Sequence, residues 1–134
     1  MDILIDTNVY AAFKGNKQEA IELLQEAHRI YISTIVLGEI LCGIQVSRHR
    51  KKNFYELNEF LDSPRVQLVE IDEKTAYFYS EIYKRLKQKG RPIPNNDMWI
   101  SATAMRFGIM VASYDKHFGY VDGLLWHNPG DREV

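Results

Sequence analysis

Short apolar runs alternate along the chain with longer segments in which apolar residues recur at helical spacing. The apolar runs have the length of buried strands and occupy residues 2–6, 29–33, 66–71 and 109–113, with a weaker fifth run at residues 123–127. The predicted helices occupy residues 16–29, 33–44, 50–62, 73–89 and 97–107. This alternation predicts an α/β protein whose mostly parallel sheet of four to five strands is covered by helices on both faces.

Particular residues mark the start and the end of the fourth predicted helix and the loop that separates it from the fifth. Asp72 can cap the helix at residues 73–89, which Gly90 ends. Residues 91–96 (RPIPNN) predict a loop, because prolines and asparagines lie close together there. Sites in such open sheets form at the carboxyl ends of the strands, so the residues that follow the strands are the first candidates for chemistry.

The composition is that of an ordinary globular protein. Of 134 residues, 46% are hydrophobic and 26% are charged, and this length predicts one domain over residues 1–134. No apolar run approaches the roughly 20 residues that span a bilayer, and no signal peptide is recognisable. We therefore expect a cytoplasmic protein without a membrane segment. The lone cysteine, Cys42, excludes an intramolecular disulfide, and its apolar neighbours predict a small buried side chain.

The charges are balanced over the chain but not evenly distributed. The formal net charge is −1, from 17 lysines and arginines and 18 acids, which argues against a generally basic nucleic-acid binder. Residues 48–52 (RHRKK) and 84–91 (KRLKQKGR) nevertheless hold nine of the 17 cations. Each stretch is either a solvated face or a surface that binds a polyanion. The candidate phosphate contacts are Arg48, Arg50, Lys51, Lys52, Lys84, Arg85 and Lys87.

Three carboxylates occupy positions where the edges of a parallel sheet converge. Asp6 ends the first strand, Asp97 opens the last helix, and Asp115 follows the strand at residues 109–113. Each also has a plain structural interpretation: Asp97 as a first-turn acid, Asp115 as the start of a turn, and Asp6 as a cap. A cluster of carboxylates around a divalent cation would explain these three positions and that of a fourth acid, Glu39, at once.

A fourth carboxylate, Glu39, lies within the apolar helical sequence TIVLGEILCGI. A carboxylate in such surroundings must be paired, protonated or bound to a cation, and no lysine or arginine lies within one helical turn of it. An all-oxygen site suits Mg²⁺ or Mn²⁺. No two histidines have the spacing of a zinc site, and His117 is interpreted as a histidine of a surface loop.

Four segments carry a resemblance to a known family: ILIDTN at residues 3–8, IVLGEI around Glu39, PNNDMWISATA at residues 94–104 and VASYDKHFGYVDGL at residues 111–124. The chain resembles the PIN-domain ribonucleases, in particular VapC-type toxins of toxin–antitoxin pairs. The resemblance implies a three-layer α/β/α sandwich and a Mg²⁺- or Mn²⁺-dependent endoribonuclease. It implies catalytic and metal-binding roles for Asp6, Glu39, Asp97 and Asp115, and supporting polar roles for Thr7, Asn8, Asn96 and Ser113.

Two positions depart from the family pattern. Ser113 stands where threonine is common, which keeps the hydroxyl group, and Tyr114 stands where a smaller or charged residue is frequent. The family further implies an RNA substrate, a cognate antitoxin that covers the acids, and a homodimer. Aromatic residues on the helix at 73–89 could stack on bases, but their helical positions favour a place in the core. They are Tyr77, Phe78, Tyr79 and Tyr83.

Two other functions remain open from the sequence. A phosphatase with an aspartate nucleophile would also end its first strand in Asp, but it would have a second Asp at the position of Asn8. A catalytically silent PIN-like domain that only binds protein or RNA is the other alternative. The presence of all four acids argues against that alternative.

Overall fold

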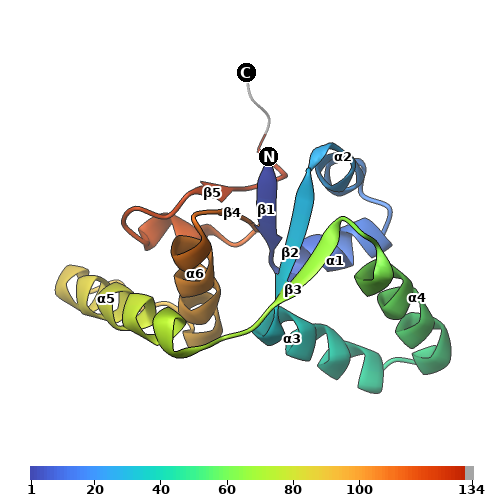
Figure 1. The fold of residues 1–134 in the computed structure, drawn as a ribbon, viewed down its shortest axis with the longest axis horizontal. Helices are drawn as coiled ribbons and strands as arrows, with labels where there is room; N and C mark the ends of the chain where they lie inside the picture. Colours follow the sequence, from blue (N-terminus) through green and yellow to red (C-terminus); the bar gives the residue numbers. More distant parts are fainter. Residues whose placement is uncertain (132–134) are drawn as a thin grey trace.

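A computed structural model of the chain describes residues 1–131 and contains a five-stranded parallel sheet flanked by six helices. Helices α1 to α4 lie on one side in Figure 1, and α5 and α6 lie on the other. The predicted α/β sandwich is therefore confirmed. The strands are β1 (Asp2–Ile5), β2 (Arg29–Ser33), β3 (Val66–Val69), β4 (Met110–Ala112) and β5 (Trp126–His127). The helices are α1 (Thr7–Lys14), α2 (Gln18–Glu26), α3 (Thr34–Gln45), α4 (Arg50–Asp62), α5 (Glu73–Lys89) and α6 (Asn95–Phe107).

The strand order β3-β2-β1-β4-β5 puts β1 at the centre of the sheet. Its side chains Ile3, Leu4 and Ile5 are fully buried, as expected for a strand covered on both faces. Ile5 is in register with Ala112 of β4. The residues that follow these two strands, beginning with Asp6 and Ser113, therefore emerge side by side at the carboxyl edge.

Helix α1 was missing from the sequence prediction, which contained no helix between residues 6 and 16. The interpretation of Asp6 as a cap is confirmed, since its side chain accepts a hydrogen bond from the backbone N–H of Thr7. Val9 and Tyr10 are buried on the inner face of this eight-residue helix. A short 3₁₀ helix, η1 (Lys116–Tyr120), replaces the predicted turn after Asp115.

Two expectations about buried side chains were wrong. Cys42 is exposed on α3, although its neighbours in sequence are apolar. Tyr77 and Tyr83 are 69% and 50% exposed and Phe78 is 37% exposed, because α5 packs through Thr75, Ile82 and Leu86 instead. The remaining aromatic residue of that set, Tyr79, is partly buried and stacks on Trp99 of α6 with ring centroids 4.0 Å apart. Within residues 1–131, no helix is both long enough and apolar enough to cross a bilayer.

Candidate active site

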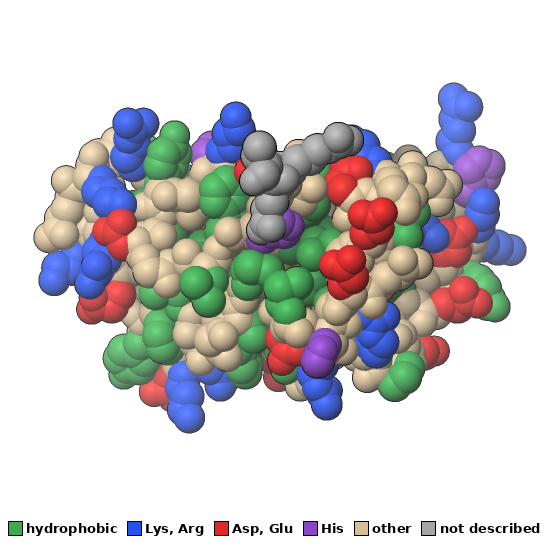
Figure 2. All heavy atoms as spheres, turned by 90° about the horizontal axis from the view of Figure 1, so that it is seen from above, with side chains coloured by type: hydrophobic (Ala, Val, Ile, Leu, Met, Phe, Trp, Pro, Cys, Tyr) green, Lys and Arg blue, Asp and Glu red, His purple; other side chains and the backbone are tan. Residues whose placement is uncertain are grey.

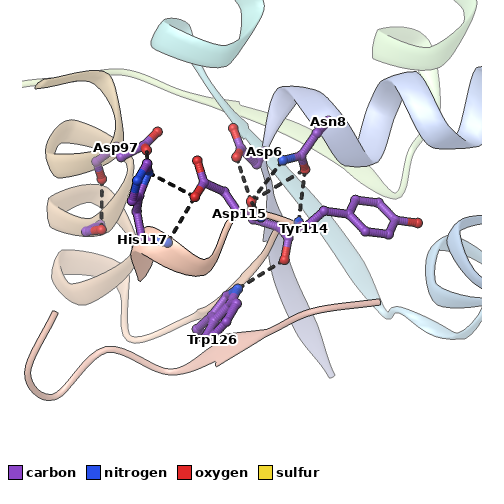
Figure 3. Close-up of polar contacts among 9 residues, drawn as sticks. Asp6, Asn8, Asp97, Tyr114, Asp115, His117 and Trp126 are labelled. Carbon is purple, nitrogen blue, oxygen red and sulfur yellow. Dashed lines mark hydrogen bonds and ion pairs between the residues drawn. The ribbon is translucent and has the colours of Figure 1, made fainter. Parts of the chain in front are cut away.

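A buried network joins the ends of β1 and β4. Asp6 is 6% exposed, and its Oδ2 accepts a hydrogen bond of 2.7 Å from the hydroxyl of Ser113 (Figure 3). Its Oδ1 accepts one of 2.8 Å from the backbone N–H of Thr7. The hydroxyl oxygen of Ser113 in turn accepts the backbone N–H of Asp115 at 3.0 Å. Ser113 therefore links two of the predicted acids and fixes the orientation of Asp6.

Asn8 holds the segment after β4 against α1. Its Oδ1 accepts a hydrogen bond from the backbone N–H of Tyr114 at 3.2 Å, and its Nδ2 donates to the hydroxyl of Ser113 at 3.2 Å. The phenol of Tyr114 donates to Glu19 of α2, so its ring is directed away from the acids, as Figure 3 shows. Burial, followed by the hydrogen bond to Glu19, raises the pKa of Tyr114 to about 12.

Glu39 is connected to the site through neutral side chains. The hydroxyl of Thr7 donates to its Oε1 at 2.7 Å, and Asn96 donates to its Oε2 at 3.4 Å. These bonds tie α3 to α1 and to the first turn of α6. Glu39 is partly buried, so the apolar sequence around it does not enclose it fully.

Asp97 and Asp115 face each other across the side chain of His117. Asp97 lies in the first turn of α6 and is 9% exposed. The Nδ1 atom of His117 is 2.9 Å from Oδ1 of Asp115 and 3.5 Å from Oδ2 of Asp97 (Figure 3). The interpretation of His117 as a surface-loop residue was therefore incomplete. Its side chain is 44% exposed, yet one ring nitrogen lies within the acidic cluster.

The acids destabilise one another's charged forms. Burial raises the pKa of Asp6, and the negative charges of Glu39 and Asp115 add to this effect, against hydrogen bonds from Ser113 and Thr7. The pKa of Asp97 rises to about 6, first because of burial and then because of Asp6 and Asp115. In the part of the chain that the structure describes, no lysine or arginine forms an ion pair with these carboxylates.

The donor atoms fit a divalent cation. One ligand atom each from Asp97, Asp115 and His117 lies within 4.8 Å of the other two. Two carboxylates with an imidazole nitrogen form a donor set used by divalent metals, and a cation among them would relieve the repulsion that raises the pKa of Asp97. The negative charge of Asp6 also raises the pKa of Asp97, so Asp6 lies near these ligand atoms.

Comparison with known proteins identifies the family. Residues 3–124 match the family model described as the PIN domain. This chain belongs to the PIN domain family. The chain is 32% identical over 133 residues to Ribonuclease VapC2 of Rickettsia felis. The aligned residues cover 96% of this chain and 98% of the relative. The predicted resemblance is therefore confirmed.

Solved structures agree with this assignment. The PIN domain matches a chain in the crystal structure of VapBC2 from Rickettsia felis bound to a DNA fragment from their promoter, with a TM-score of 0.83 and 28% identity. That match covers 96% of this chain and 98% of the other. A chain of FitAcB from Neisseria gonorrhoeae matches with a TM-score of 0.78 and 27% identity, over 95% of this chain and 97% of that one.

Proposed function

We propose that this PIN domain is a metal-dependent endoribonuclease, the toxin component of a toxin–antitoxin pair, and that it hydrolyses phosphodiester bonds in RNA. The observation that carries the proposal is the convergence of Asp6, Asp97 and Asp115 at the carboxyl edge of the sheet, with the pKa of Asp97 raised to about 6 by burial and by the other two acids. The relatives named as VapC ribonucleases support the same activity.

Asp97 and Asp115 would hold the cation, with Asp6 beside them, and Mg²⁺ or Mn²⁺ suits such carboxylates. A divalent cation bound there supplies Lewis acidity that activates water and offsets the negative charge of the phosphodiester. Ser113 and Thr7 keep Asp6 in one orientation through its two oxygens. Glu39 lies outside the group of close ligand atoms and is partly exposed, which suits a carboxylate that accepts a proton from the attacking water.

Cations lie at both ends of the molecule. Figure 2 shows lysine and arginine side chains gathered at both ends of its long axis, and Figure 1 places α4 and α5 at those opposite ends. The stretch at residues 48–52 leads into α4, and residues 84–91 span the end of α5. An RNA strand bound over the carboxylate cluster could extend toward residues 48–52 or toward residues 84–91 and contact those cations through its phosphates.

The antitoxin is proposed to cover the acids from an open groove next to Glu39. Thr7, Tyr10 and Lys14 of α1 line one side of this groove, and Ile40 and Ile44 of α3 line the other. Its lining is mainly apolar, and Glu39 and Thr7 lie at its edge, so an apolar segment bound there would reach the site. We also propose that the chain forms a homodimer, which sedimentation equilibrium of the isolated protein tests directly.

An RNA cleavage assay separates this function from its alternatives. An unstructured RNA labelled at one end is incubated with the protein, with and without EDTA, beside a chromogenic phosphate monoester. The proposal predicts internal cleavage that EDTA abolishes and no release of phosphate from the monoester. Hydrolysis of the monoester alone would indicate the phosphatase. RNA binding without cleavage in Mg²⁺ and in Mn²⁺ would indicate the silent binding domain.

A further inference from the structure

His117 has a position that the proposed reaction does not yet use. Figure 3 shows its imidazole ring between the carboxylates of Asp97 and Asp115. Its Nδ1 atom is 3.5 Å from the first and 2.9 Å from the second. Two ligand atoms at right angles around an ion with bonds of about 2.1 Å are separated by roughly 3 Å. The three side chains therefore already have the spacing of neighbouring ligands of one cation.

The same nitrogen forms no hydrogen bond in the described structure. Nδ1 is buried and has no hydrogen-bond partner, although it lies 2.9 Å from Oδ1 of Asp115. The His117 side chain as a whole is 44% exposed, so its exposed surface belongs to other atoms of the side chain. A buried nitrogen that forms no hydrogen bond is unfavourable unless it binds a ligand. An imidazole nitrogen binds metal ions well.

We propose that His117 is a nitrogen ligand of the catalytic cation and that it makes the site prefer Mn²⁺ and other transition metals to Mg²⁺. This inference rests on the metal site of the proposed function. Mg²⁺ prefers oxygen ligands, whereas transition metals gain affinity from an imidazole. Asp97 and Asp115 alone would suit either class of ion, so His117 is the residue that discriminates between them.

The substitution His117→Asn tests this role with little change in shape. Asn can place an amide oxygen near the position of Nδ1, so it keeps a neutral oxygen ligand and removes the nitrogen. His28→Asn is the matched control, because His28 is exposed and precedes β2 at the opposite edge of the sheet. Circular dichroism and thermal unfolding establish that each variant is folded.

Binding is measured on protein freed of metal with EDTA. Mn²⁺ affinity comes from the electron paramagnetic resonance signal of the free ion, and Mg²⁺ affinity comes from competition. The parent and His28→Asn should bind Mn²⁺ more tightly than Mg²⁺. His117→Asn should lose about tenfold or more in Mn²⁺ affinity and only a few-fold in Mg²⁺ affinity. Pulsed resonance of Mn²⁺ bound to the parent, labelled with ¹⁵N-histidine, should show a nitrogen coupling that His117→Asn lacks.

The outcomes separate this inference from the proposed function. Tight Mn²⁺ binding without a histidine coupling, or an unchanged ratio of affinities in His117→Asn, overturns the role of His117 and leaves the carboxylate metal site intact. A parent that binds neither ion overturns both proposals. Should His117→Asn fail to fold, the histidine coupling in the parent alone decides the inference.

Discussion

Asp97 is the residue at which burial and charge repulsion act together. Asp97 as a whole is 9% exposed and its carboxylate faces Asp6 and Asp115, so its pKa is raised to about 6 from the ordinary 3.8. Between about pH 4 and about pH 6 the folded chain therefore binds more protons at this carboxyl than the unfolded chain does. The stability that this carboxyl contributes falls as the pH rises from about 4 to about 6, and the loss persists at higher pH.

Replacing Asp97 by Asn should abolish RNA cleavage and stabilise the metal-free protein. In EDTA at pH 8 we expect a gain of about 1–2 kcal/mol in the free energy of unfolding, because a buried charge and its repulsion are removed. The gain should shrink toward zero near pH 4, where the parent carboxyl is protonated. Urea unfolding at several pH values measures both effects.

The control for that experiment is Asp62→Asn, which removes an exposed carboxylate at the end of α4. It should change the stability little at any pH. A clear loss of stability in Asp97→Asn at pH 8 would show that Asp97 is a structural partner, and the repulsive cluster would then be the wrong description.

Ser113 connects the two halves of the carboxylate network. Ser113 is fully buried. Ser113→Ala removes the hydroxyl that donates to Asp6 and accepts from the backbone N–H of Asp115. We expect a loss of about 1–3 kcal/mol in the free energy of unfolding and slower cleavage. Ser80→Ala, at an exposed position of α5, is the matched control. Equal stability of the two variants would mean that the Ser113 hydroxyl does not hold the site together.

The acids that end strands or begin helices could be predicted from the sequence, and the contacts between elements could not. Asp6, Asp97 and Asp115 stand next to recognisable element boundaries, and the structure brings them together. The contact of His117 with Asp97 links η1 to α6 across 20 positions of sequence, and no local pattern indicates it. The hydrogen bond from Thr7 to Glu39 likewise depends on how α1 packs against α3.

Helix α4 begins in an unfavourable electrostatic setting. Arg50, Lys51 and Lys52 occupy its first turn, which contains no acid. The positive end of the helix dipole repels them, at a cost of a few tenths of a kcal/mol per exposed charge. A sequence selected only for folding would place acids there. These cations are therefore expected to contact a polyanion.

Replacing the four cations of residues 48–52 by Gln should weaken RNA binding. Each lost phosphate contact lowers the slope of log affinity against log salt by roughly one unit. Single-turnover cleavage at saturating RNA should change little, because the acids are untouched. Affinities across a salt series measure the effect, with Arg29→Gln and Lys74→Gln together as a control that removes two cations elsewhere on the surface. Equal affinities and slopes in parent and variant would leave residues 48–52 as a solvated face or a surface for a protein partner.

Element prediction failed where a helix is short or a side chain faces outward. Helix α1 has only eight residues, so its buried Val9 and Tyr10 form too little of a repeat to be recognised beside the strand. The exposed Tyr77 and Tyr83 lie on a helix that buries a single narrow face. The order of the strands depends on long-range pairing, of which the sequence contains no local trace.

For the whole molecule, a bound cation should raise the stability of the folded state by mass action. At about 100 times its dissociation constant the gain is roughly 2.7 kcal/mol. We expect Mn²⁺ to raise the midpoint of thermal unfolding of the parent and to have much less effect on Asp97→Asn. Calorimetry measures this shift. A parent midpoint that does not move with saturating Mn²⁺ would contradict a metal site in the folded chain.

The sequence predicts one domain over residues 1–134. One domain should unfold in a single cooperative transition, with equal calorimetric and van't Hoff enthalpies. Residues 132–134 lie outside the described residues, and the prediction does not depend on them. Two separate transitions in the isolated monomer would contradict it.

Metal-dependent cleavage at the carboxylate cluster is tested by the single-turnover rate of internal RNA cleavage by the parent and by Asp97→Asn, each in EDTA and after Mn²⁺ is restored. Only the parent should cleave, and only with the metal, while the folded variant leaves the RNA intact in both conditions. Cleavage by the parent in EDTA, or equal rates for parent and variant with Mn²⁺, would contradict it.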